Sequence, residues 1–189
     1  MATAHQRLDL RKAKALLVDD NPQSLELLSQ VLTGFRMREM KACRSVAEAR
    51  EILTTQRFDV ILADLDMPDE DGLTLVRQIR SETRAPNYTT PIIILHGFTP
   101  AGMVHSARDA GANMVVRKPI APSVLLSRLE WIARNNREFI TADGYNGPDR
   151  RFRQVPLAED QQERRAEALA LIADPTRALS QDDISALFD

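Results

Sequence analysis

Short apolar runs alternate with amphipathic segments along the first 137 residues of the chain. The apolar runs have the length and composition of buried strands and lie over 16–18, 37–42, 58–63, 92–95 and 114–116. Between them, apolar residues recur at three- and four-residue spacing, which is typical of helices packed on one face. Five strands alternating with five helices predict an α/β domain over 1–137, built on a doubly wound parallel sheet.

Local signals place several helix ends. The dipeptide Asn21-Pro22 marks a turn whose proline suits the first position of a helix. Ser45 is expected to cap the second helix, and Ser123 the fifth. Gly111 is expected to end the fourth helix, because glycine readily takes the left-handed conformation found after a helix.

The pattern changes after residue 137. Glycines and prolines break the periodicity, so residues 138–156 are predicted to form an extended linker, and 157–189 a helical tail. The tail is expected to end in a short helix capped by Ser180, with an apolar edge of Ile184, Leu187 and Phe188.

Composition narrows the class of protein. Net charge is +3 over 1–137 and −5 over 138–189, so an acidic tail follows a mildly basic body. The single cysteine, Cys43, excludes an internal disulfide framework and is expected in the core. No apolar run approaches the length of a signal peptide or a membrane span, which predicts a soluble cytoplasmic protein.

Four ionisable residues carry the candidate chemistry. Asp19 and Asp20 follow the first strand directly, Asp64 follows the third, and Lys118 follows the fifth. The carboxyl ends of parallel strands meet at one edge of a sheet, so these side chains are expected to converge. Three carboxylates and an ammonium group suit Mg²⁺ and a phosphoryl group.

These residues resemble those of a known family, the CheY-type receiver domain of bacterial response regulators. The resemblance covers about 13–136 and is carried by Val18-Asp19-Asp20, Asp64-Leu65-Asp66-Met67-Pro68, Asp71-Gly72 and Lys118-Pro119. It implies a flavodoxin-like sheet of order 2-1-3-4-5. In this family the Lys-Pro peptide bond is commonly cis, so the resemblance implies a cis bond between Lys118 and Pro119.

The resemblance assigns roles to the acidic site. Asp64 is the expected phosphoacceptor, and Lys118 the clamp for phosphoryl oxygens. Mg²⁺ is the expected cofactor, held by Asp19, Asp20, Asp64 and the backbone carbonyl of Asp66. The phosphodonor is expected to be a histidine kinase or a phosphotransfer protein. No enzyme activity is expected beyond intrinsic aspartyl phosphorylation and dephosphorylation.

Two positions depart from the family pattern. His96 stands where the family has a threonine or serine, and Val115 where it has a switch aromatic. His96 could donate to phosphate, or pair with Asp66 and hold the pocket in one state. The effect of phosphorylation then reaches the output surface by another route, or the receiver switches weakly. The alternative is that both residues are tolerated variation in a working switch.

Residues 179–188 resemble the N-terminal peptide of the flagellar motor switch protein, which binds the phosphorylated chemotaxis regulator as a helix. Such a peptide is expected to bind this receiver's own face, another receiver, or a motor or signalling protein. A generic capped helix is the alternative. The tail is too short and too acidic for a usual DNA-binding output domain.

The leading hypothesis is a phosphorylatable response regulator acting through protein contacts, in chemotaxis or related signalling. One alternative is a scaffold, a pseudo-receiver that is not phosphorylated. Another is an effector of a cyclic dinucleotide, bound through Arg150, Arg151 and Arg153.

Overall fold

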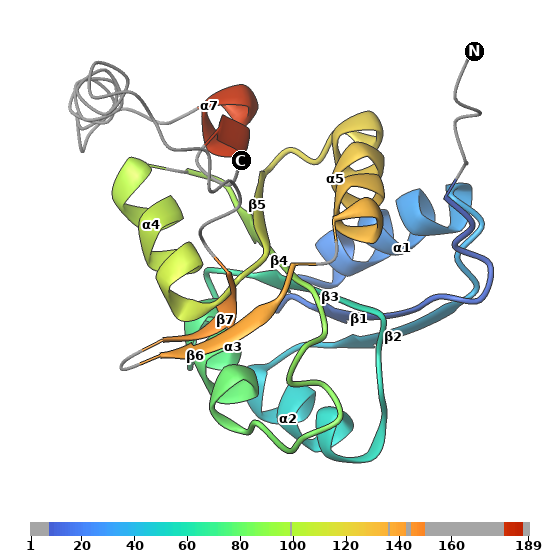
Figure 1. Ribbon diagram of the computed structural model, residues 1–189. Helices are drawn as coiled ribbons and strands as arrows, with labels where there is room; N and C mark the ends of the chain where they lie inside the picture. Colours follow the sequence, from blue (N-terminus) through green and yellow to red (C-terminus); the bar gives the residue numbers. More distant parts are fainter. Residues whose placement is uncertain (1–7, 99, 136, 143–144, 150–179, 187–189) are drawn as a thin grey trace, which may run out of the picture.

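Five parallel strands form the central sheet, in the order β2-β1-β3-β4-β5. The computed structural model describes residues 8–98, 100–135, 137–142, 145–149 and 180–186. The strands are β1 (Lys14–Val18), β2 (Glu39–Cys43), β3 (Val60–Asp64), β4 (Ile92–His96) and β5 (Met114–Arg117). The sequence-based fold class and strand order are therefore confirmed (Figure 1).

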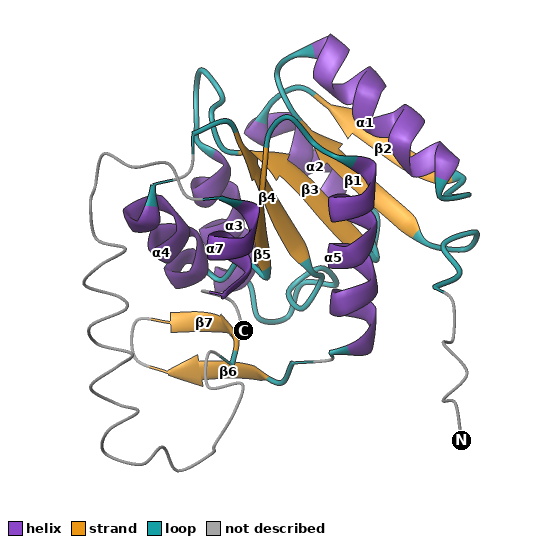
Figure 2. Ribbon diagram, turned by 90° about the horizontal axis from the view of Figure 1, so that it is seen from above, coloured by secondary structure: helices purple, strands orange, loops and turns teal. Residues whose placement is uncertain are grey.

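Helices cover both faces of this sheet. One face carries α1 (Pro22–Gly34) and α5 (Pro122–Arg134), and the other carries α2 (Val46–Thr55), α3 (Gly72–Ser81) and α4 (Ala101–Ala110). Figure 2 shows the two sets on opposite sides of the strands. This is the three-layer arrangement expected when parallel strands alternate with helices.

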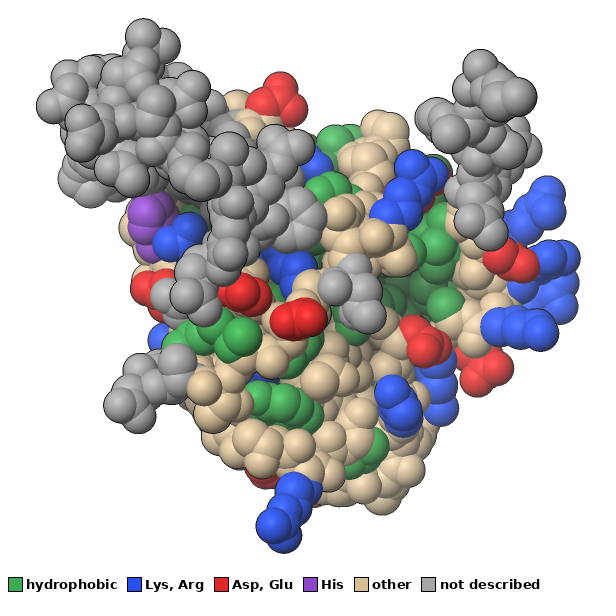
Figure 3. Space-filling model, in the orientation of Figure 1, with side chains coloured by type: hydrophobic (Ala, Val, Ile, Leu, Met, Phe, Trp, Pro, Cys, Tyr) green, Lys and Arg blue, Asp and Glu red, His purple; other side chains and the backbone are tan. Residues whose placement is uncertain are grey.

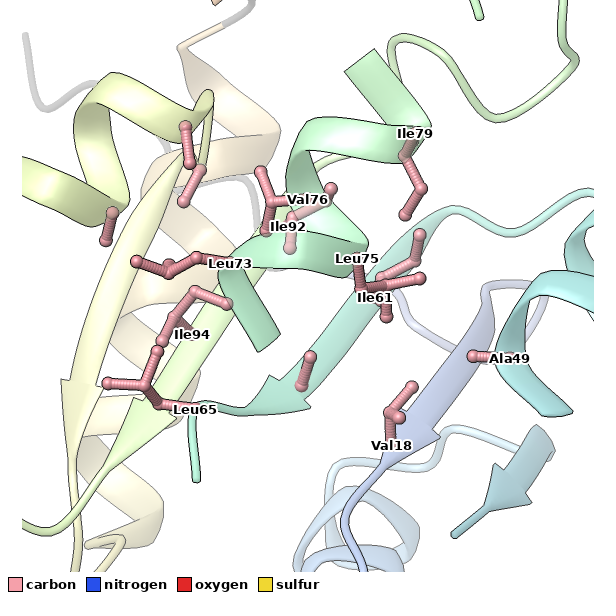
Figure 4. Close-up of a cluster of buried hydrophobic side chains, with 14 of the residues drawn as sticks. Val18, Ala49, Ile61, Leu65, Leu73, Leu75, Val76, Ile79, Ile92 and Ile94 are labelled. Carbon is pink, nitrogen blue, oxygen red and sulfur yellow. The ribbon is translucent and has the colours of Figure 1, made fainter. Parts of the chain in front are cut away.

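The sheet divides the hydrophobic core into two clusters, one on each face. Figure 4 shows the cluster beneath α2 and α3, where Ile61 and Ile92 from the strands meet Leu75 and Val76 of α3. Cys43 is buried as predicted, and burial raises the pKa of its thiol to about 12. The thiol is therefore protonated at neutral pH.

Most of the predicted helix ends are confirmed. Asn21 caps α1 by accepting from two backbone N–H groups, and Pro22 is the first helical residue. The Ser45 side chain accepts from the N–H of Glu48 at 3.1 Å, and Gly111 ends α4 with φ of 99°. The prediction for Ser123 is wrong, since α5 already begins at Pro122 without a side-chain cap. The fixed φ of proline suits the first helical turn, so the helix starts two residues earlier than a cap at Ser123 would place it.

A hairpin follows α5, where an extended linker was predicted over 138–156. Its strands are β6 (Phe139–Ala142) and β7 (Tyr145–Pro148), paired antiparallel. Gly147, which looks like a breaker in the sequence, instead allows close packing. A Cβ at Gly147 would lie 2.9 Å from the Cα of Gly111. The described part of the linker is thus built onto the domain.

Buried Arg80 holds together the region beneath the hairpin. Its side chain is 1% exposed, and its guanidinium lies 4.9 Å from the ring centre of Phe139. Burial lowers its pKa from 12.5 to about 10. The guanidinium donates to the carbonyl oxygens of Tyr88, Thr90 and Gly111 and to Oδ1 of Asn113. Arg80 therefore joins α3, the hairpin and the loops before β4 and β5.

The C-terminal helix α7 (Gln181–Ala186) lies against β5 in both ribbon views. Leu187 and Phe188 of the predicted apolar edge, and the tail helix expected before 180, lie outside the described residues. Among the described helices, none is both long and apolar enough to cross a membrane.

Replacing Arg80 tests the role of this buried cation. Arg80→Met keeps the apolar stem but leaves buried carbonyl oxygens without their donor, so the free energy of unfolding should fall by about 3 kcal/mol. Arg77→Met on the exposed side of α3 is the control, with an expected change below about 0.5 kcal/mol. Urea denaturation measures both, and equal stabilities of the two variants would contradict the role of Arg80.

Candidate functional site

Three strand ends bring the candidate site together. Asp19 directly follows β1, Asp64 ends β3, and Lys118 directly follows β5. Lys118 Nζ lies 2.8 Å from Asp19 Oδ2 and 2.8 Å from Asp64 Oδ1. The Lys118-Pro119 peptide bond is cis, as expected. Residues up to 99 positions apart in the sequence thus converge on one ammonium group.

Asp19 is fixed by neighbours on the first turn of α1. Its carboxylate is almost fully buried, and it accepts from the N–H of Asn21 at 2.9 Å and from Ser24 Oγ at 2.6 Å. Ser24 was not singled out from the sequence, where it looks like an ordinary residue of the first helix. Its contribution is to orient the carboxylate before any ligand arrives.

Asp20 completes a group of three carboxylates. Asp19, Asp20 and Asp64 each offer an oxygen, and these oxygens all lie within 4.8 Å of one another. Oxygen donors from a few carboxylates are the ligands that Mg²⁺ prefers. The side chain of Asp66 is largely exposed at 73%, and the ligand role of its backbone carbonyl stays a prediction.

Burial and charge act in opposite directions at the centre of the site. Burial raises the pKa of Asp64, the bond from Lys118 lowers it, and the charge of Asp19 raises it again; the net direction is upward. For Lys118, burial lowers the pKa, but bonds to Asp19 and Asp64 outweigh burial and raise it. Lys118 is therefore a firmly charged cation rather than a base.

A tight backbone contact supports Asp64. The N–H of Gly72 donates to the carbonyl of Leu65 at 2.9 Å, which brings the start of α3 against the end of β3. A Cβ at Gly72 would lie 2.2 Å from the Asp64 carbonyl oxygen. Only glycine fits here, so the Asp71-Gly72 part of the sequence motif has a steric cause.

His96 lies at the end of β4 beside this group. Its Nδ1 is 2.9 Å from Asp66 Oδ2, although the angle is not that of a hydrogen bond. Its backbone carbonyl accepts from the N–H of Lys118 at 2.8 Å. The side chain thus lies near Asp66, as one of the two sequence hypotheses proposed. Thr99 lies outside the described residues.

A doubly wound five-stranded sheet with an aspartate group and a lysine at its carboxyl end defines the class of CheY-like signalling receivers. The chain belongs to the family described as the response regulator receiver domain, whose model matches residues 15–130. Receiver domains of this family act in two-component signalling, and the chain is therefore a response regulator receiver over this range.

Similar proteins include two curated bacterial proteins. Response regulator protein PilR of Pseudomonas aeruginosa is 35% identical over 111 residues, covering 59% of this chain and 24% of PilR. Protein PetR of Rhodobacter capsulatus is 35% identical over 129 residues, covering 67% of this chain and 51% of PetR. The chain thus matches only about a quarter to a half of these relatives.

Solved structures agree with this fold. Chemotaxis response regulator CheY4 of Vibrio cholerae is 30% identical with a TM-score of 0.59, covering 64% of this chain and 98% of CheY4. The receiver domain of histidine kinase CKI1 of Arabidopsis thaliana, complexed with Mg²⁺ and BeF₃⁻, is 28% identical with a TM-score of 0.59. That match covers 67% of this chain and 93% of the CKI1 domain.

Two glycine-to-alanine variants test the steric contact between Gly72 and the backbone of Asp64. In Gly72→Ala, the added Cβ would push the start of α3 away from the backbone of Asp64 and Leu65. The free energy of unfolding should therefore fall by about 2 kcal/mol or more. Gly102→Ala in α4 meets nothing within 4 Å and should leave stability equal or higher. Thermal unfolding compares them, and a stable Gly72→Ala variant would show that the contact is unimportant.

The raised pKa of Asp64 gives a pH dependence with a definite sign. Between pH 3.8 and the higher folded-state pKa, the folded protein binds more protons, so stability falls as pH rises through this window. Without Mg²⁺, Asp64→Asn should therefore be more stable than the wild type at pH 7, and the difference should shrink towards pH 4. Asp69→Asn, at an exposed position, is the control. Urea unfolding at several pH values measures this, and a less stable Asp64→Asn at pH 7 would contradict the sign.

Proposed function

We propose that this protein is a phosphoacceptor response regulator, phosphorylated at Asp64 with Mg²⁺. The observation that carries the proposal is the double contact of Lys118 Nζ, at 2.8 Å, with Asp19 and Asp64. It puts a fixed cation beside the carboxylate that is placed to react. Intrinsic phosphorylation and dephosphorylation are the only chemistry expected.

The donor set fits Mg²⁺. Asp19, Asp20 and Asp64 supply carboxylate oxygens close enough to share one ion, and the Asp66 carbonyl is proposed as a further ligand. Three neighbouring carboxylates repel one another unless a cation neutralises them. A single Lys118 does not balance three negative charges, so a divalent cation is expected to stabilise the group.

The residues have distinct roles in the proposed reaction. Asp64 Oδ attacks phosphorus, and the bond from phosphorus to the donor nitrogen of a phosphohistidine, or to the donor oxygen of a small phosphodonor, breaks as the new bond forms. Negative charge on the phosphoryl oxygens is stabilised by Lys118. Bound Mg²⁺ supplies further charge stabilisation. Ser24 keeps Asp19 oriented throughout.

A scaffold that is not phosphorylated is the second candidate. It is favoured by the approach of His96 to Asp66, because Asp66 competes with a phosphoryl group for Nδ1 of this histidine. Val115 on β5 likewise provides no aromatic ring to move. The intact contacts of Lys118 favour phosphorylation over this alternative. The arginines of the cyclic-dinucleotide hypothesis lie outside the described residues.

The output is proposed to be a protein contact in the cytoplasm, in chemotaxis or related signalling. Similarity to CheY4, a chemotaxis response regulator, supports the setting. The resemblance of 179–188 to a motor switch peptide supports a helix that binds a receiver, and α7 lies on this receiver's own β5. Binding to a second receiver or to a motor protein stays a proposal. No DNA-binding module occurs among the described residues.

Phosphorylation can be measured directly. With acetyl phosphate and Mg²⁺, intact-mass spectrometry should show one phosphoryl adduct, which Asp64→Asn abolishes. Lys118→Met should slow its formation roughly a hundredfold, because the fixed cation is lost. Lys12→Met, at an exposed position, is the matched control. An unmodified wild type under the same conditions would favour the scaffold.

A further inference from the structure

The side chain of Gln181 binds the backbone of β5 at two points. Its Oε1 accepts from the N–H of Arg117 at 2.8 Å, and its Nε2 donates to the carbonyl of Val115 at 3.3 Å. A residue of a neighbouring parallel strand makes the same pair of bonds. Since β5 is an outer strand, Gln181 takes the place that a sixth strand would occupy.

Ile184 anchors the same helix in the core. It is 0% exposed and belongs to the buried cluster that contains Val104 of α4 and Val115 of β5. A valine at 115 is much smaller than an aromatic ring, so a side chain from outside the sheet can complete this part of the core. Complete burial of an isoleucine contributes about 2 kcal/mol.

The helical structure of α7 is expected to depend on its contact with β5. A helix of six residues is not stable in water by itself, since nucleation outweighs so few hydrogen bonds. Gln181 and Ile184 provide one polar and one apolar anchor. The helix is consequently expected to form only while it is docked on β5.

The docked helix is linked to the phosphorylation site through one peptide unit. Arg117, held by Gln181, directly precedes Lys118. The N–H of Lys118 is bound to the His96 carbonyl at 2.8 Å, and its Nζ contacts Asp19 and Asp64. Gln181, Lys118 and Pro119 also border one small cavity. The end of β5 is thus fixed from both sides.

We propose that α7 is a built-in coupling element and that Gln181 is a positioning residue for Lys118. Docked α7 holds the end of β5 so that the ammonium group faces Asp64, which strengthens binding of a phosphoryl-type anion there. Because such coupling is reciprocal, the anion at Asp64 must stabilise docked α7 by the same factor. The inference rests on the proposed function, since it assumes that Asp64 binds such an anion.

The test uses the full chain and beryllofluoride with Mg²⁺, titrated by amide NMR. Gln181→Ala should weaken the affinity for beryllofluoride roughly fivefold. Ile184→Ala removes the other anchor and should weaken it similarly. Asp182→Ala changes an exposed side chain on the same turn and should have no effect.

Amide hydrogen exchange, measured with and without beryllofluoride, provides an independent measurement. In Gln181→Ala, the Arg117 amide should exchange faster, because its acceptor is lost. In the wild type, beryllofluoride should slow exchange of the α7 amides. A purely structural role of Gln181 would change the first rate but leave beryllofluoride affinity unaltered.

The outcomes separate the two proposals. Equal beryllofluoride affinity in the wild type and Gln181→Ala overturns the coupling but leaves phosphorylation intact. Tighter binding in Gln181→Ala also overturns it, because α7 would then oppose the anion. A wild type that does not bind beryllofluoride overturns the proposed function and the coupling with it.

Discussion

The ion contacts of Lys118 with Asp19 and Asp64 depend on nearly every layer of the structure. Each of the three residues lies at the end of a different strand, so the contacts exist only when β1, β3 and β5 are in register. Packing on both faces of the sheet fixes that register, because a one-residue slip would move every strand side chain to the opposite face, where it would not fit the helices packed there. Charges that are half-buried in this way are screened less by water than surface pairs, and their geometry matters correspondingly more.

The two ends of the central sheet differ in what they contain. The carboxyl ends of the strands hold the charged site, whereas the opposite end is closed by Arg80 and the hairpin of β6 and β7. In the face shown in Figure 3, several Lys and Arg side chains gather on the side of the described N-terminal segment. Rigidity at the closed end leaves the loops at the charged end as the parts of the domain best able to respond to a ligand.

Sequence reasoning predicted what depends on local pattern and strand order. The five strands, the convergence of Asp19, Asp64 and Lys118, and the cis Pro119 bond are confirmed. The hairpin was missed because Gly147 and Pro148 resemble chain breakers, and because Gly147 packs against Gly111, which is distant in sequence. Ser24, Arg80 and Gln181 were missed for a related reason, since the groups they bind are identified only by three-dimensional neighbours. Such contacts leave no periodic signal.

The anchored hairpin has a further consequence for any outside partner. The hairpin ends near Asp149 at the closed end, and α7, in the same chain, lies on β5, so α7 is a ligand that is covalently attached to its receptor. A tethered ligand has a local concentration that does not change when the protein is diluted. A partner for the β5 surface must therefore compete with an internal rival at every cellular concentration of the protein.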